Sequence, residues 1–151
     1  MIPDRIRAEL ERLGLKALEF EPGSTPTAPA AAERIGVEVG QIAKSLLFRA
    51  KDGSYHLVLC AGDKKVNSSR LKALVGFKCS MADAEETVRI TGCPPGGVCP
   101  YGVRDATIWI DESLSAWPTV YPAAGTDATG VPTTYNALVA LAGGRTCAVT
   151  E

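Results

Sequence analysis

The chain has 151 residues, 46% of them hydrophobic and 22% charged, and its formal net charge at pH 7 is −1. This length and apolar content are enough for one domain with a hydrophobic core and leave little room for a second, so residues 1–151 are predicted to form a single domain. The near-neutral charge excludes a protein that is basic throughout, as proteins that hold long stretches of nucleic acid are, so any contact with nucleic acid should be local.

The sequence predicts a cytoplasmic protein that does not contact a membrane. No run approaches the roughly 18 apolar residues of a membrane span, and the N-terminal residues enter an amphipathic pattern at once. The five cysteines, at positions 60, 79, 93, 99 and 147, are odd in number and irregularly spaced. This usage does not suit a secreted disulfide framework and agrees with a reducing compartment.

We expect neither a metal nor a cofactor. Cys93 and Cys99 are separated by five residues and have no histidine beside them, which does not match the spacing of a zinc site. The single histidine, His56, lies in an alternating strand pattern. A solvent-facing position is expected for it there, and no catalytic role.

In the first half of the chain, helices and short strands are expected first, followed by two strands of a sheet. Ile6, Leu10 and Leu13 lie at helical spacing, and Gly14 is well placed to end that helix. Hairpin and turn residues mark the strands that follow. The expected elements are a helix over residues 3–13, a strand over 17–21, a turn-rich loop over 22–27, a helix over 29–35, a helical turn over 39–44, and strands over 45–49 and 55–61.

The second half alternates short helices and strands. The expected elements are a helix from residue 68 or 69 to 74, a strand over 77–79, a helix over 83–90, strands over 106–111 and 119–121 around a helical turn at 112–115, a helix over 135–141 and a closing strand over 145–149. This irregular alternation predicts an α+β domain. The densest basic cluster is either a solubilising face or a phosphate contact, and it comprises Lys64, Lys65, Arg70 and Lys72.

Residues 91–102 form what we call the glycine loop, which reads Thr-Gly-Cys-Pro-Pro-Gly-Gly-Val-Cys-Pro-Tyr-Gly. Its glycines and prolines exclude a helix interior and a central strand. Val98 and Tyr101 need burial, so the loop is not a solvated linker. Glycine allows backbone N–H groups to approach a ligand and proline holds them in place, which suits an oxyanion site. A stiff crossover between two sheet elements is the alternative.

Three segments resemble the YbaK/ProX family, the aminoacyl-tRNA deacylases related to the editing insertion of bacterial prolyl-tRNA synthetases. Residues 96–100, Gly-Gly-Val-Cys-Pro, fit its Gly-x-x-x-Pro motif. Residues 42–48, Ile-Ala-Lys-Ser-Leu-Leu-Phe, resemble its Val/Ile-x-Lys-Thr/Ser-Leu segment. Residues 121–125, Tyr-Pro-Ala-Ala-Gly, resemble its small-residue strand end, which is followed by glycine. The order and spacing of the segments are also similar.

The resemblance implies a fold and an activity. The fold is a curved, mixed, mostly antiparallel sheet or partial barrel with surrounding helices. The activity is trans-editing, the hydrolysis of the ester of a mischarged tRNA that carries a small amino acid such as Cys, Ala, Ser or Thr, with tRNA-Pro as the first candidate. The implied partners are the acceptor end of an aminoacyl-tRNA and, in addition, an aminoacyl-tRNA synthetase.

The resemblance also implies site residues. Gly96, with Gly97 as a second candidate, would donate to the oxyanion, Lys44 would orient the ester or the terminal phosphate, and Pro100 would hold the loop. These roles make Lys44, Gly96 and Pro100 the expected catalytic residues. The expected substrate-binding residues are Thr27, Ala43, Ser45, Gly97, Ala124 and Gly125.

Two alternatives and one departure from the family pattern remain. Cys93 or Cys99 could act as a nucleophile, although no base lies near either in sequence, and a non-catalytic module could bind aminoacyl-tRNA or a synthetase without cleavage. No strong general base is visible, which fits family members thought to use positioned water or groups of the substrate. After Gly125 the chain reads Thr-Asp-Ala-Thr-Gly-Val-Pro where the family has a regular strand. Asp127 is either a substitute polar group or an exposed turn residue there, and the turn is the expectation. The amino-acid specificity stays open.

Overall fold

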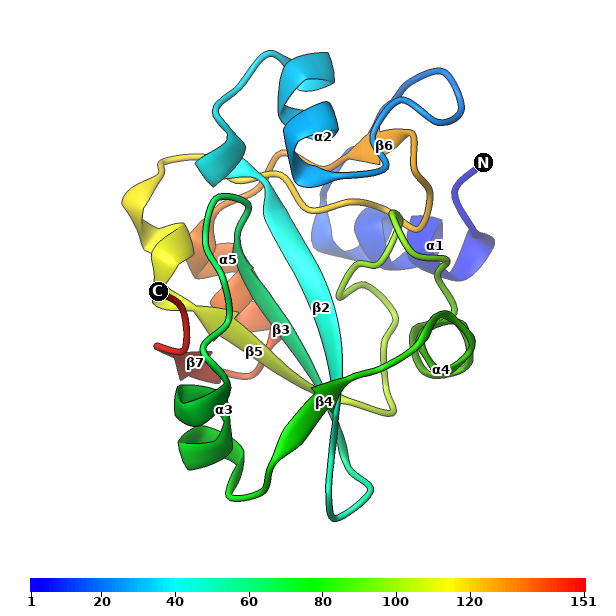
Figure 1. The fold of residues 1–151 in the computed structure, drawn as a ribbon. Coiled ribbons are helices and arrows are strands. Elements are labelled where there is room, and N and C mark those ends of the chain that lie inside the picture. The colour runs from blue at the N-terminus through cyan, green and yellow to red at the C-terminus, as the bar shows by residue number, and fades with distance from the viewer.

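A five-stranded open sheet forms the centre of the fold in the computed structural model, which describes residues 1–151 (Figure 1). Its strand order is β4-β2-β3-β5-β7. Antiparallel pairs join β2 to β3 and to β4, whereas β5 runs parallel to β3 and to β7. The strands are β2 (Ala43–Ala50), β3 (Tyr55–Ala61), β4 (Cys79–Met81), β5 (Thr107–Asp111) and β7 (Thr146–Cys147).

A two-stranded antiparallel ribbon lies beside the start of β2. It consists of β1 (Leu18–Glu19) and β6 (Thr129–Gly130). Isolated bridges pair Ile42 with Tyr121 and Val120 with Thr133. They extend the hydrogen bonding from the start of β2 to the segment that leads into β6, which gives this end the character of a partial barrel, while the main sheet stays open. Three of the five strand pairs are antiparallel, so the predicted α+β fold with a mixed, mostly antiparallel sheet is confirmed.

The helices begin where the sequence offers capping side chains. The side chains of Thr27, Asn67, Asp83 and Thr134 each accept a hydrogen bond from a backbone N–H of the first helical turn. No helix is long and apolar enough to cross a membrane. The helices are α1 (Asp4–Leu13), α2 (Ala28–Ile35), α3 (Ser68–Val75), α4 (Ala84–Thr91) and α5 (Tyr135–Leu141), with short 3-10 helices η1 (Val39–Gln41) and η2 (Glu112–Ala116).

The sheet is covered on both faces, and β3 shows this most clearly. Leu57 and Leu59 pack into the cluster that includes Leu138 of α5. Val58, between them in sequence, packs on the other face with Leu71 of α3. Because successive side chains of a strand point to opposite faces, a strand buried on both sides is apolar without interruption. The start of β2 and the residues around it are thereby held on a rigid support.

The predicted position of His56 is wrong. Its side chain is 7% exposed. Its Nδ1 accepts a hydrogen bond from Nε1 of Trp109 at 3.1 Å, and its Nε2 lies 2.9 Å from Oγ of Ser54. The alternating pattern suggested a solvated face, but the second face of β3 is covered by α3 and the C-terminal segment. Burial lowers the pKa of His56, so the imidazole is favoured in its neutral form.

Other predicted elements also differ from the structure, among them the strand predicted over residues 77–79, which lies at Cys79–Met81. Only residues 39–41 of the expected helical turn are helical, and β2 begins at Ala43. Val120 and Tyr121 form single bridges where a strand over residues 119–121 was expected, and the closing strand contains two residues, not five. In each case the backbone partner is distant in sequence, for example Gln41, whose C=O accepts from the N–H of Tyr121. Local propensity does not contain that information.

Candidate active site

A pocket of about 230 Å³ opens at the start of β2, and we call it the β2 pocket. Segments distant in sequence form its walls: the turn before α2 with α2 itself, the start of β2, the glycine loop, and the stretch from Tyr121 to Thr129. Nine of its sixteen lining residues are hydrophobic. The lining residues are Thr25, Pro26, Thr27, Ala28, Ala31, Ile35, Ile42, Ala43, Lys44, Ser45, Leu46, Gly96, Val98, Tyr121, Ala123 and Thr129.

The structure brings five of the nine predicted site residues together around this pocket. They are Thr27, Ala43, Lys44, Ser45 and Gly96. The other four, Gly97, Pro100, Ala124 and Gly125, are not in its lining. Thr25, Val98, Tyr121 and Thr129 also line it but were not predicted as site residues. Signals were available for three of them, since Thr25 lies in the turn-rich loop, Val98 lies inside the glycine loop and Tyr121 begins the segment 121–125 that resembles the family.

Lys44 is the only charged residue in the lining. Its Nζ donates to the backbone C=O of Gly62 at 3.4 Å and to the backbone C=O of Lys64. An ammonium group has three donors, so one remains after these two contacts. No carboxylate forms an ion pair with Lys44. The lysine is therefore a positioned cation at the pocket with a donor still available.

Ser45 presents polar groups to the same pocket. Its Oγ is buried and has no hydrogen-bond partner. The backbone of Ser45 lies on the edge of β2 that faces away from β3. On this edge, the N–H of Ala43 donates to the C=O of Tyr121 at 3.1 Å, and the C=O of Leu47 accepts from the N–H of Ala82 at 2.9 Å. Because alternate residues of an antiparallel strand face the same edge, the backbone of Ser45 lies at the open edge between these two contacts. A ligand in the pocket can satisfy groups that the protein leaves unpaired.

The glycine loop supplies backbone donors. Gly96 has a φ of +90°, in the left-handed region that favours glycine. Gly96 and Val98 both line the pocket, and the N–H of neither is hydrogen-bonded to another backbone group. The N–H of Gly97, in contrast, donates to the C=O of Pro94 at 2.9 Å. Gly96 and Val98, and not Gly97, are therefore the candidate donors to an oxyanion.

Gly97 and Gly125 lie where two backbone segments meet. The N–H of Gly125 donates to the C=O of Gly97 at 2.9 Å. A Cβ on Gly97 would lie 2.6 Å from the backbone nitrogen of Thr126, and one on Gly125 would lie 2.6 Å from Cδ1 of Ile6. The contact at Gly97 is with backbone and too short for a side chain, and Gly125 has a φ of +88°, in the left-handed region that favours glycine, so both positions favour glycine. The glycine loop therefore packs closely against residues 124–126 at Gly97, and residues 124–126 pack against α1 through Gly125.

Ala124 and Pro100 are buried outside the pocket lining. Ala124 belongs to the cluster around α1, and its N–H donates to Oγ1 of Thr129 at 2.9 Å. Pro100 ends the Gly-x-x-x-Pro stretch, and its C=O accepts from the N–H of Val103 at 3.4 Å. Ala124 therefore supports a residue of the pocket wall, Thr129, whereas the contact of Pro100 is with a residue outside the lining.

The structure does not bring Cys93 or Cys99 to the pocket. Both side chains are fully buried, in a cluster with Ile6, Leu10 and Tyr101. A hydrogen bond with the Cys99 thiol and the nearby guanidinium of Arg5, whose Nη2 lies 3.8 Å from the Cys93 sulfur, lower the pKa of Cys93. The same hydrogen bond and burial raise the pKa of Cys99. Neither sulfur lies where it could attack a group bound in the β2 pocket.

No carboxylate or imidazole lines the pocket. Asp127 lies in a turn as predicted, but it is half-buried and not exposed, and its Oδ1 accepts from the N–H of Gly23 at 3.1 Å, outside the lining. His56 is bonded to Trp109 on β5. The pocket can therefore bind and polarise an ester through Lys44, Ser45 and the glycine loop, while its own residues offer no strong base.

Comparison with known proteins gives the family. Residues 22–141 match the aminoacyl-tRNA editing domain, and every residue that lines the β2 pocket falls within this range. The uncharacterized protein YwhH of Bacillus subtilis is 42% identical over 108 residues, which are 71% of this chain and 68% of that protein. The proline–tRNA ligase of Thermosipho melanesiensis is 36% identical over 84 residues, which are 55% of this chain but only 15% of the ligase.

Solved structures share the fold over nearly the whole chain. The hypothetical protein APE2540 has a TM-score of 0.90 at 27% identity and is matched over 98% of this chain and 100% of its own. A protein described as a "putative trans-editing enzyme for prolyl tRNA synthetase" has a TM-score of 0.89 at 35% identity, over 100% of this chain and 99% of its own. With the family match over most of its length, the chain belongs to the aminoacyl-tRNA editing domain family.

Proposed function

We propose that this protein is a trans-acting deacylase that hydrolyses the ester between a small amino acid and the terminal adenosine of a mischarged tRNA. Cys, Ala, Ser and Thr are the candidate amino acids, and tRNA-Pro is the first candidate tRNA. One observation carries the proposal: Lys44, Ser45 and the unbonded N–H groups of Gly96 and Val98 surround a single pocket inside the family match.

The size and lining of the β2 pocket support a small aminoacyl group as its ligand. Its volume of about 230 Å³ lies below the roughly 300–1,000 Å³ of sites that bury drug-sized ligands. Ala31, Ala43 and Ala123 contribute small side chains to the walls. A pocket of this size takes an amino-acid side chain, while the adenosine and the rest of the tRNA stay outside.

The chemistry follows from the polar groups. Water adds to the ester carbonyl, and the oxyanion that forms accepts hydrogen bonds from Gly96 and Val98. One such donor is worth about 3 kcal/mol to the transition state. The C–O bond to the ribose then breaks, and the ribose oxygen takes up the proton that the water loses.

Lys44 orients the ester or the terminal phosphate through a charge-assisted hydrogen bond. Because the lining holds no carboxylate or imidazole, a group of the substrate, such as the free hydroxyl of the terminal ribose, assists the proton transfer. In this scheme residues 1–151 act as one unit in the cytoplasm, where tRNA is charged, with a synthetase as a second partner.

The test is a deacylation panel with the purified protein. The substrates are tRNA-Pro charged with Cys, Ala, Ser, Thr or Pro, and Ala and Ser on their own tRNAs. We expect release of one mischarged species above the spontaneous rate, with Pro on tRNA-Pro spared. Release of none would contradict the proposal and favour a non-catalytic module that binds aminoacyl-tRNA or a synthetase.

A further inference from the structure

Charge is unevenly distributed along this near-neutral chain. Residues 44–78 hold eight of the 16 basic residues but only two of the 17 acidic ones, a net charge of +6. The rest of the chain therefore carries −7. This excess belongs to a stretch of sequence, so it marks a basic surface only where its lysines are exposed and unpaired; Glu151, whose backbone pairs with that of Lys65, is an acidic residue beside them.

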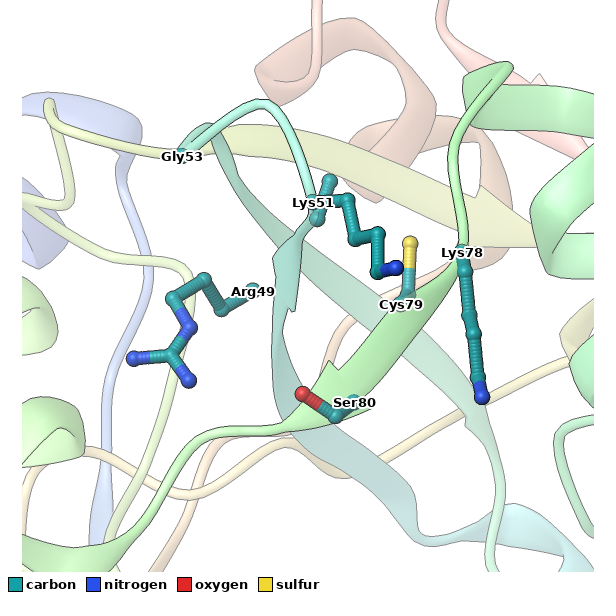
Figure 2. A pocket seen from close by; sticks show the side chains of 7 residues that line it. Arg49, Lys51, Gly53, Lys78, Cys79 and Ser80 are labelled. Carbon is teal, nitrogen blue, oxygen red and sulfur yellow. The ribbon is translucent and has the colours of Figure 1, made fainter.

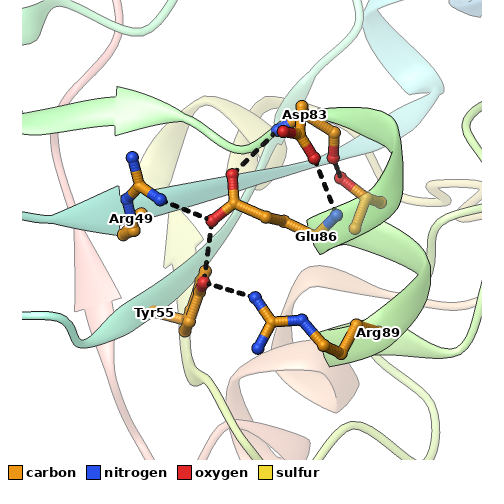
Figure 3. Close-up of polar contacts among 6 residues, drawn as sticks. Arg49, Tyr55, Asp83, Glu86 and Arg89 are labelled. Carbon is orange, nitrogen blue, oxygen red and sulfur yellow. Dashed lines mark hydrogen bonds and ion pairs between the residues drawn. The ribbon is translucent and has the colours of Figure 1, made fainter.

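Five lysines in this stretch are exposed and form no ion pair. We call them the lysine surface: Lys51, Lys64, Lys65, Lys72 and Lys78. Arg49, by contrast, donates to Oε2 of Glu86 at 2.9 Å, and the same oxygen accepts from the hydroxyl of Tyr55 at 2.8 Å (Figure 3). Its charge is neutralised within the fold, whereas those of the five lysines are directed to solvent.

The lysine surface begins at the rim of the β2 pocket. The backbone C=O of Lys64 accepts a hydrogen bond from Nζ of Lys44, so the loop that carries Lys64 and Lys65 lies beside the pocket. This loop runs along the sheet to α3, which carries Lys72, and then to β4 (Figure 1).

The far end of the lysine surface borders a hollow of about 520 Å³. The backbone N–H of Lys51 donates to the C=O of Lys78 at 2.9 Å, so the two lysines adjoin. Figure 2 shows both at the rim of this hollow, on either side of Cys79, while the Arg49 side chain points away from them. From Lys44 in β2 to Lys51 just after its end there are seven residue steps. At a rise of about 3.3 Å per step they span about 23 Å.

We infer that the lysine surface binds phosphates of the double-helical acceptor stem while the aminoacylated end occupies the β2 pocket. This inference rests on the proposed function, because the stem adjoins the single-stranded end whose ester would be cut. Lysines recognise a duplex through its phosphates and shape and not through its sequence. The surface should therefore add affinity without selecting the tRNA.

The test measures binding of uncharged tRNA, which does not require hydrolysis. The variant is Lys72→Gln with Lys78→Gln, both remote from the pocket lining. The matched control is Lys16→Gln with Arg104→Gln, two exposed basic residues outside the stretch. Loss of two phosphate contacts should lower the slope of log affinity against log salt concentration by about 1.5 and weaken binding severalfold at low salt, with the control unchanged.

Two further probes keep the outcomes distinct. An aminoacyl-adenosine ester lacks the stem, so the Lys72/Lys78 variant should hydrolyse it as fast as the wild type does. Equal tRNA affinity and salt slope in variant and wild type would overturn the inference while leaving hydrolysis intact. Lysine-dependent tRNA binding without any hydrolysis would contradict the proposed function alone.

Discussion

Ser45 carries a buried hydroxyl group without a hydrogen-bond partner, in the wall of the β2 pocket. Leaving such a group unpaired costs about 1–3 kcal/mol of folding free energy. Ser24 carries a second such hydroxyl, outside the pocket lining. The two serines therefore form a matched pair that separates a substrate contact from a merely unsatisfied group.

Ser45→Ala should raise the free energy of unfolding and lower deacylation. Removing the unpaired hydroxyl stabilises the free protein by about 1 kcal/mol, whereas losing a hydrogen bond to the substrate slows the reaction by about tenfold. Ser24→Ala should give a similar gain in stability with no change in rate. Denaturant unfolding and single-turnover deacylation measure the two effects. Unchanged deacylation by Ser45→Ala would contradict a substrate contact.

At the scale of elements, the backbone conformation of the glycine loop is the feature that positions its donors. Gly96→Ala places a Cβ at a φ of +90° and 3.3 Å from the C=O of Pro26. Gly14→Ala imposes a left-handed alanine too, at a φ of +72°, but in open space at the end of α1. Each should cost about 1–2 kcal/mol of stability.

Only Gly96→Ala should lower the deacylation rate strongly, by about 100-fold, because it moves a backbone N–H donor away from the oxyanion. Thermal unfolding measures the loss of stability in each variant, and kcat measures the loss of deacylation. A similar loss of activity in Gly14→Ala would show that lower stability alone is responsible, and it would remove the case for a positioned donor.

At the scale of elements, the ends of the helices and part of the site could be predicted from the sequence. Helix ends were predictable because capping residues such as Thr27 and C-terminal glycines such as Gly14 act locally. The grouping of Lys44, Ser45 and Gly96 was predictable from the family motifs. The part of Val98 in the pocket, the commitment of the Gly97 N–H to Pro94 and the burial of His56 were not predictable, because each depends on packing between distant segments.

At the scale of the whole molecule, Asp111 joins the C-terminal segment to the end of β5. Its carboxylate accepts from the N–H of Val149 at 2.8 Å, the N–H of Ser113 at 3.0 Å and the hydroxyl of Thr150 at 2.8 Å. Burial opposes ionisation, but these hydrogen bonds outweigh it and hold the pKa of Asp111 below its ordinary value. The carboxylate therefore stabilises the fold in its ionised form.

Asp111→Asn should lower the free energy of unfolding by about 2 kcal/mol at neutral pH. A lowered folded pKa contributes stability above the unfolded pKa of about 3.9, and this contribution is lost as the pH falls through the folded pKa. The difference between wild type and variant should therefore shrink in acid. Urea unfolding across pH checks this, with the exposed Asp105→Asn as control. A difference that stays constant with pH would contradict a role for the ionised carboxylate.

The most direct test of the central claim is single-turnover release of the amino acid from mischarged tRNA-Pro by wild type and by Lys44→Ala. Because Lys44 is the only charged residue of the pocket, its loss should slow release by about 10- to 100-fold, the value of a charge-assisted hydrogen bond. Wild-type release that is selective and depends on lysine would establish the pocket as the site of editing. Equal rates in the two proteins, or no release by the wild type above the spontaneous rate, would contradict the account.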